Sequence, residues 1–378
     1  MTGLTKAGLP NKSRSYGARS FLVWLVVYFL VGYVVLDFLV DRIPESTSLK
    51  VNDPSFWDLK EVYANRLSEV RSRGGYSILM LGSSKTQFGF RGETVEAAIR
   101  EDSTKTPLAF GFGLPGMGPL YQWTCAKRLE RMGLLPDIVL LEVHGALFIE
   151  ASGSGPGITR ELGWLSRERV LSKEWMDLAS IGVTACMKSG MMPIWFENRF
   201  TLLAPIRALI QKVDSGPKKP RNVIDRFGGP RLPTDADADN PRVKSLSNLD
   251  KTREEYSEMV GNFPPGSGES IGPQDLFGPA WESLKSTIHL LRKNGCRVIL
   301  VRMPEGPAFR SWYAPNLAQV EALKFRSFLL PEAKDWIDAR EWFEEDKFWD
   351  SNHLNPKGAQ IFSERLAREI LSVANNQR

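Results

Sequence analysis

Five short apolar runs alternate along this chain with segments of helical pattern, and this alternation constrains the fold more than any other feature. The expected strands are 76–81, 107–112, 137–143, 297–301 and 336–338. The expected helices are 58–72, 93–100, 119–132, 279–294, 316–328 and a closing helix that Asn355 caps. Continuous apolar strands separated by helices are typical of a parallel sheet that helices cover on both faces. The sequence therefore predicts an α/β protein, built as a three-layer α/β/α sandwich around a central parallel sheet.

The alternation is interrupted between about residues 150 and 275. Segments rich in Gly, Pro, Ser and Asp, such as SGSGPG at 152–157 and PPGSG at 264–268, punctuate helical patterns there. We expect a long, partly disordered insertion that acts as a lid or as a partner surface.

The N-terminal region contains an apolar run, FLVWLVVYFLVGYVVLDFLV at 21–40, whose one charge is Asp37. A helix of about 20 such residues spans a bilayer. A cleaved signal peptide is the alternative, but the run is long for one and no small-x-small cleavage site follows it. Four basic residues and no acidic residue precede the run, which favours a cytoplasmic N-terminus. We therefore expect a single-pass protein of the cytoplasmic membrane whose C-terminal domain is extracytoplasmic, in the periplasm or at the cell surface.

This topology divides the chain into four parts: a cytoplasmic tail at 1–19, a transmembrane helix at 20–40, a tether with a lead-in helix at 41–72, and the α/β domain at 73–378. The net charge of +5 is no argument for nucleic acid, because the tail supplies four of these charges. The three cysteines, Cys125, Cys186 and Cys296, are too few and too far apart for a disulfide framework or a metal site, and they fit small core positions.

His353 is the histidine whose surroundings favour chemistry. It lies in FWDSNHLNPKGAQ, three residues after Asp350 and just before the closing helix. A carboxylate so placed can accept the Nδ1 proton of the imidazole, which leaves Nε2 free to take a proton. The alternative is a helix-entry turn in which Asp, Ser and Asn serve only as caps.

Ser84 lies in the segment LGSSKTQFGF, which ends the first apolar run abruptly. Gly, Ser and Lys are ordinary turn residues. However, the carboxyl end of a parallel strand is also where open α/β sheets place their active sites.

The ordered pair of GSS near the start of the domain and DSNHLNPKG at its end resembles the SGNH, or GDSL-like, hydrolase superfamily. The resemblance covers roughly residues 74–145 and 280–375, and it implies a flavodoxin-like fold with Ser84 as nucleophile, His353 as base and Asp350 as its partner. Ser83 stands where the family pattern usually has Asp. Some membrane-anchored relatives that transfer acyl groups to cell-surface polymers look similar, with Gly-Ser-Ser at this place.

The resemblance also implies an oxyanion hole. Its second block follows the second strand, where GFGLPGMGPL nominates the backbone N–H of Gly116 to act together with that of Ser84. Its third block, Gly-x-Asn-Asp, is not matched, because the chain has His144-Gly145-Ala146-Leu147 there. Three interpretations stay open: another group such as His144 replaces the asparagine, the hole has two donors, or activity is lost.

A loop after the fourth strand, RMPEGPAFRSWY at 302–313, carries further candidates. Arg302, Glu305 and Arg310 lie at the carboxyl end of a strand, where they can border the crevice and contact a sugar or an acyl donor. Such residues on a Pro- and Gly-rich loop are more often simply solvated.

Other site types find little support in the sequence. The three histidines, among them His289 within an expected helix and partly buried there, lack the spacing of zinc ligands, so no metal is expected. The glycines of GFGLPG have dinucleotide-loop spacing, but Glu142 is the one acidic residue near the right place, and no cofactor is expected.

The apolar run at 21–40 predicts a membrane anchor, and the resemblance implies a serine acyl-transfer enzyme, so together they suggest a membrane-anchored enzyme of this kind. Its expected partners are the membrane, an acyl donor, a carbohydrate or other hydroxyl acceptor, and a membrane acyltransferase or export complex. The alternatives are a simple esterase or lipase-like hydrolase and a catalytically inactive scaffold of an export complex.

Overall fold

The computed structural model describes residues 14–41, 53–102, 106–143, 174, 177, 224–229, 279–310, 335–350 and 352–375. Its elements in chain order are α1 (Arg14–Asp41), α3 (Pro54–Ser72), β1 (Tyr76–Gly82), α4 (Ser84–Gly89), α5 (Gly92–Asp102), β2 (Pro107–Gly113), α6 (Pro119–Arg131), β3 (Ile138–Val143), α13 (Pro279–Lys293), β4 (Arg297–Arg302), α14 (Pro307–Arg310), β5 (Asp335–Asp338), the 3₁₀ helix η7 (Glu345–Lys347) and α16 (Pro356–Asn375). These elements alternate as the sequence predicts.

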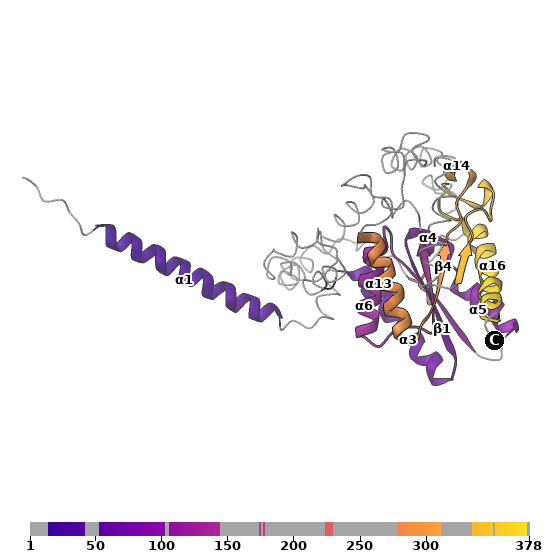
Figure 1. Cartoon of the computed structure of the whole chain (residues 1–378), viewed down its shortest axis with the longest axis horizontal. Coiled ribbons are helices and arrows are strands. Elements are labelled where there is room, and N and C mark those ends of the chain that lie inside the picture. Colours follow the sequence, from indigo (N-terminus) through magenta and orange to yellow (C-terminus); the bar gives the residue numbers. More distant parts are fainter. Residues whose placement is uncertain are drawn as a thin grey trace, which may run out of the picture.

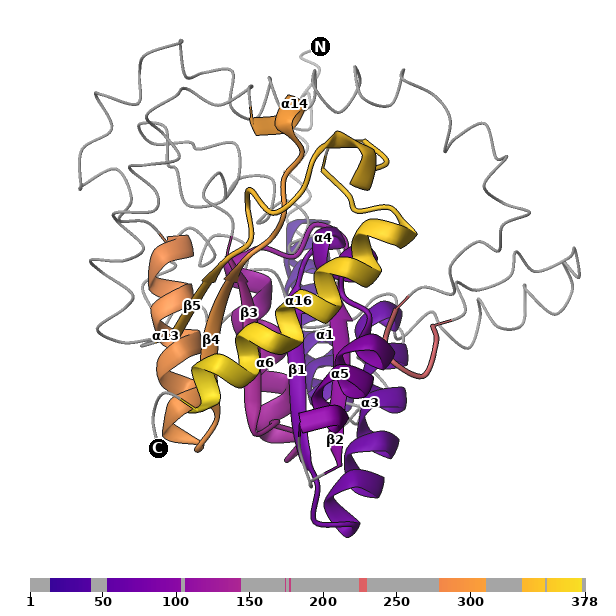
Figure 2. The ribbon, with the colours of Figure 1, turned by 90° about the vertical axis from the view of Figure 1, so that its right-hand side faces the viewer.

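The five strands form one parallel sheet in the order β2-β1-β3-β4-β5. This order confirms the predicted α/β class with a parallel sheet. Chain connections leave β1 and β3 in opposite directions across the sheet, so a crevice is expected at their carboxyl ends. Leu81 of β1 pairs with Leu141 of β3, which brings Gly82 and Glu142 side by side at that edge. Figure 2 shows α4 at this end of β1.

Helices cover both faces of the sheet (Figure 1), as expected for strands that are apolar on both sides. Helices α3, α6 and α13 pack on one face, and α5 and α16 pack on the other. Successive strand residues point to opposite faces, so Leu79 joins the first core and Ile78 the second. The three layers leave the carboxyl end of the sheet to loops and to the short α4.

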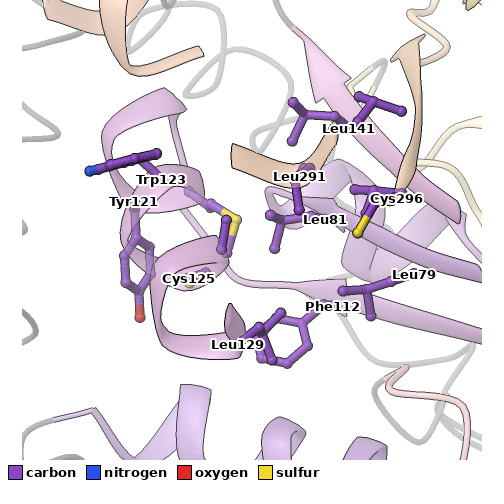
Figure 3. Close-up of a cluster of buried hydrophobic side chains, with 14 of the residues drawn as sticks. Leu79, Leu81, Phe112, Tyr121, Trp123, Cys125, Leu129, Leu141, Leu291 and Cys296 are labelled. Carbon is purple, nitrogen blue, oxygen red and sulfur yellow. The ribbon is translucent and has the colours of Figure 1, made fainter. Parts of the chain in front are cut away.

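Figure 3 shows part of the core between the sheet and α6, where Leu79 and Leu81 of β1 lie near Cys125 and Leu129. Cys125 and Cys296 are buried free thiols, which confirms their prediction as core residues. Burial raises the pKa of the Cys296 thiol to about 11, so this sulfur stays protonated at neutral pH. Cys186 lies outside the described residues.

Helix α3 begins at Pro54, earlier than the predicted residue 58. Asp53 caps it, because its side chain accepts a hydrogen bond from Phe56 N at 3.2 Å, and Pro54 suits the first turn. Arg128 of α6 is fully buried against this cap, with Nη1 2.7 Å from Asp53 Oδ2, and its Nε lies 2.7 Å from Glu174 Oε1. The ion pairs thus join the start of α3, α6 and one residue of the predicted insertion.

Several predictions fall outside the described part of the chain. They include the helix at 316–328 and all of the insertion except Glu174, Asp177 and residues 224–229. Helix α4 was not predicted, since its six residues are too few for a periodic pattern.

Helix α1 contains the apolar run at 21–40, and its described side chains, such as Phe21, Trp24 and Leu30, are exposed. Among the residues that the structure describes, no helix combines the length and the apolar character needed to cross a membrane.

Candidate active site

Ser84 is the first residue of α4, directly after the turn that ends β1. Ser83 has extended backbone angles and caps the helix, because its hydroxyl oxygen accepts a hydrogen bond from Lys85 N at 3.2 Å. The chain changes from strand to helix within two residues, so the Ser84 side chain is presented at the carboxyl edge of the sheet. The polar residues of this turn therefore have a definite structural use as caps, whatever else Ser84 does.

His353 and Asp350 lie in the loop between η7 and α16. Asp350 Oδ1 accepts hydrogen bonds from His353 N at 2.7 Å and from Asn352 N at 3.1 Å, which fold the loop back on itself. The other carboxylate oxygen, Oδ2, lies 2.7 Å from His353 Nδ1. The loop is closed further by Trp349 N, which donates to the His353 carbonyl at 2.9 Å.

Ser84 and His353 come from opposite ends of the domain's sequence and are in contact. His353 Nε2 lies 2.9 Å from Ser84 Oγ, although the residues are 269 positions apart. Because a carboxylate only accepts hydrogen bonds, Asp350 places the proton of His353 on Nδ1 and leaves Nε2 to accept from Ser84. The structure thus brings together the serine, histidine and aspartate that the sequence nominated.

Phe88 packs against the imidazole ring of His353. It lies one helical turn after Ser84 on α4, and its ring meets that of His353 edge to face at a centroid distance of 5.4 Å. Helix α4 therefore carries both Ser84 and the aromatic ring that packs against His353. His353 and Asp350 keep 23% and 19% of their side-chain surface exposed, so a reactant in solvent can reach the pair.

The pKa of the Asp350 carboxyl is lowered. Burial by itself raises this pKa, but the hydrogen bond and charge of the His353 ring and the backbone N–H groups of His353 and Asn352 outweigh it. Asp350 is therefore ionised at neutral pH and suited to stabilise an imidazolium at His353.

Gly116 lies in the turn between β2 and α6 and has a positive φ of 72°, which favours glycine. The loop starts beside the turn that carries Ser84, because Leu114 N donates to the Gly82 carbonyl at 2.9 Å. Within the described residues, the backbone N–H groups of Ser84 and Gly116 have no protein acceptor. Both groups are thus available as donors, and the oxyanion hole stays a prediction.

Glu142 is a site residue whose role sequence reasoning missed. It lies at the carboxyl end of β3, is only 4% exposed, and accepts hydrogen bonds from Ser83 and Thr86 on either side of Ser84. A signal was present, because Glu142 is the one charged residue inside the apolar run IVLLEV. The hydrogen-bond partners of this carboxylate become visible only in the folded structure.

Glu305 is buried beside α4. Its carboxylate lies 3.0 Å from Lys85 Nζ through Oε1 and 2.7 Å from Arg340 Nε through Oε2. Arg310 donates to the Glu305 carbonyl at 2.8 Å, and Arg302 lies 3.5 Å from Asp338. The contacts of Glu305 join α4 to the loops after β4 and β5. Arg302, Glu305 and Arg310 thus have structural partners, and their contact with a substrate stays a prediction.

His144 is outside the described residues, and His289 is exposed on α13 rather than partly buried as predicted. A surface hollow of about 900 Å³ is lined by residues of α6 and α13, including His289, and by none of the Ser84, His353 and Asp350 side chains. In the described parts of the chain, no cluster of three His, Cys, Asp or Glu side chains is arranged to hold a metal ion.

Comparison with known proteins adds one finding. A family model that carries no functional description matches residues 278–375, which include β4, β5, α16, Asp350 and His353 but not Ser84. No curated protein matches the chain.

Proposed function

We propose that this protein is a serine acyl-transfer enzyme of the SGNH type, with Ser84 as nucleophile, His353 as general base and acid, and Asp350 as the residue that orients His353. The observation that carries the proposal is the continuous chain of contacts from Ser84 Oγ to His353 Nε2 at 2.9 Å and from His353 Nδ1 to Asp350 Oδ2 at 2.7 Å. Helix capping does not account for it, because a cap needs no partner 269 residues away.

In the proposed reaction, Ser84 Oγ attacks an ester carbonyl carbon while its proton passes to His353 Nε2. The carbonyl oxygen becomes an anion that the N–H groups of Ser84 and Gly116 bind. As the C–O bond of the ester breaks, His353 returns the proton to the leaving alcohol and an acyl-Ser84 remains. Water or an acceptor hydroxyl then attacks the acyl carbon while its proton passes to His353 Nε2. The bond between the acyl carbon and Ser84 Oγ breaks, His353 returns the proton to Oγ, and the acid or the acylated acceptor leaves.

We further propose that the enzyme is anchored in the cytoplasmic membrane with its α/β domain outside the cytoplasm. This part rests on the sequence of the whole run at 21–40, which extends beyond the described side chains of α1. An anchor holds the site beside membrane-borne donors, so we favour transfer of an acyl group, such as acetyl, to or from a cell-surface or exported polysaccharide. Simple hydrolysis is the alternative outcome for the same intermediate.

The test is covalent labelling of the full-length protein in detergent with a fluorophosphonate probe. We expect the wild type to be labelled and the Ser84→Ala variant to be unlabelled, because only an activated serine attacks the probe quickly. His353→Gln should slow labelling by about three orders of magnitude or more, as in other Ser-His-Asp sites.

Ser72→Ala is the matched control, since Ser72 is an exposed serine at the end of α3 whose hydroxyl donates to the Glu69 carbonyl. It should be labelled like the wild type. Labelling that does not depend on Ser84, in a protein shown to be folded, would contradict the enzyme proposal and favour a scaffold. Incubation with p-nitrophenyl acetate, with and without an oligosaccharide acceptor, then separates hydrolysis from transfer by the presence of an acetylated product.

A further inference from the structure

The carboxylate of Glu142 lies directly beneath the turn that carries Ser84. Its Oε2 accepts hydrogen bonds from Ser83 N at 2.8 Å and from Thr86 Oγ1 at 2.5 Å, and its Oε1 accepts one from Ser83 Oγ at 2.6 Å. All three partners donate, which is the pattern that an ionised carboxylate satisfies and an amide does not. Ser84 lies between the two residues that Glu142 holds.

The geometry leaves room for this carboxylate only because residue 82 is a glycine. A Cβ at Gly82 would overlap both the Glu142 carboxylate and the Thr86 hydroxyl. The strand end, the turn and the first turn of α4 therefore converge on one carboxylate. Since hydrogen bonds to a charged and buried acceptor are stronger than neutral ones, this arrangement holds the turn in one geometry.

Glu142 is itself fixed by the sheet. It continues the pairing of β3 with β4 opposite Val301, and its backbone carbonyl accepts a hydrogen bond from Gln122 Nε2 of α6 at 2.8 Å. The position of the turn is thus tied to the central strands rather than to a surface loop. A nucleophile needs such support, because a displacement of about 1 Å from its base can cost a hundredfold in rate.

We propose that Glu142 is a positioning residue for the nucleophile: it clamps Ser83 and Thr86 so that Ser84 Oγ faces His353. This inference rests on the proposed function and goes beyond it, because it assigns part of the rate to a carboxylate outside the Ser-His-Asp set. The clamp acts through Ser83 and Thr86, and Glu142 does not touch the reacting atoms.

The test follows the fluorophosphonate reaction of full-length protein as a time course over a range of probe concentrations. Glu142→Gln keeps the size of the side chain but turns an N–H toward at least one of the three donors. We expect the maximal labelling rate to fall by about tenfold to a hundredfold, the range that misplacement of a reacting group produces. The probe concentration for half-maximal rate should stay as in the wild type, because no contact to the probe is removed.

Glu96→Gln is the matched control. Glu96 is another buried carboxylate, which accepts hydrogen bonds from Ala109 N at 2.9 Å and from Arg66 at 2.6 Å, and it lies on α5 without contact to the nucleophile turn. It should reduce thermal stability without changing the labelling rate of the folded protein. Circular dichroism gives the folded fraction of each variant under the labelling conditions, so the rate is compared per folded molecule and the two effects are separable.

A pair of variants makes the test specific for the clamp. Ser83→Asp places a second carboxylate against Glu142 and should slow labelling strongly, because like charges repel at this separation. Combining it with Glu142→Ser exchanges the two groups, and we expect the rate to recover by about tenfold relative to Ser83→Asp alone, since one carboxylate again faces a hydroxyl.

If Glu142→Gln does not fold, Thr86→Val decides the matter, since it removes one donor without leaving a bare buried charge; it should also slow labelling. Wild-type labelling rates in the folded Glu142→Gln or Thr86→Val variant, or no recovery in the exchanged pair, would overturn the inference. Wild-type protein that shows no Ser84-dependent labelling would instead overturn the proposed function, so the two failures are distinguishable.

Discussion

Asp350 contacts both the backbone of its own loop and the imidazole of His353. One carboxylate oxygen closes the turn through two backbone N–H groups, and the other faces the imidazole. The first set of contacts is what a capping residue makes, and it explains why the sequence alone left a helix-entry turn open as an alternative. The second set needs His353 to be held at the correct angle, and only the surrounding packing supplies that.

The lowered pKa of Asp350 makes a prediction for stability. A carboxyl whose pKa is lower in the folded state stabilises the fold above its ordinary pKa of about 3.9, and this contribution is lost as the pH falls through the lowered folded value. We therefore expect the free energy of unfolding of the wild type to fall more steeply than that of Asp350→Asn as the pH is lowered from about 5. Urea denaturation of both proteins over this range measures the difference, and parallel curves would contradict the prediction.

Among the helices, α16 begins with the cap that the sequence predicts. Asn355 Oδ1 accepts a hydrogen bond from Gly358 N at 2.9 Å, and Asn355 Nδ2 donates to the Asp346 carbonyl at 2.8 Å. The apolar face of the helix, with Phe362 and Leu366, is buried in the core, also as predicted. Because the cap lies two residues after His353, it ties the loop that carries His353 to a helix whose apolar face is buried in the core.

Replacing Asn355 by Ala removes both hydrogen bonds. We expect this variant to lose about 1 kcal/mol of unfolding free energy, which is typical of a lost helix N-cap. Fluorophosphonate labelling should also slow, since the loop that carries His353 is held less firmly. Asn355→Asp keeps the capping oxygen and is the control: it should retain most of the stability in the same denaturation experiment. Equal losses in the two variants would show that the cap is not the stabilising contact.

At the level of the domain, the sheet order explains why residues from opposite ends of the chain meet. Chain connections leave β1 and β3 in opposite directions, and Ser84 and Glu142 lie at the carboxyl ends of these two strands. Helix α16 packs on the same face of the sheet as α5, as Figure 2 shows. Buried ion pairs link the parts of this edge, with Glu305 between Lys85 of α4 and Arg340 after β5. Removing one member of such a set leaves a buried charge uncompensated, so these residues hold the loops together.

The proposed anchor makes a prediction for the complete chain. We expect the full-length protein to stay in the membrane pellet after extraction with alkaline carbonate. Leu30→Arg should weaken this retention, because an arginine near the centre of a span costs about 2.5–3.5 kcal/mol on insertion. When the layers outside the cytoplasmic membrane of intact cells are made permeable, protease added from outside should digest the α/β domain. Release of the wild type by carbonate would contradict the anchor.

The class of fold and most element boundaries were predictable, because the period of apolar residues and the cap at Asn355 are local properties of the chain. His353 and Asp350 were nominated from their local spacing and Ser84 through the resemblance to the SGNH superfamily, although both segments had ordinary turns as their alternative. The hydrogen bonds of Glu142 and the ion pairs of Glu305 were not predicted, because the sequence around a single acidic residue does not show which residues it contacts in the fold. Their contacts join strands and loops distant in sequence, and burial away from water is what makes those contacts strong, so only the packed fold could reveal them.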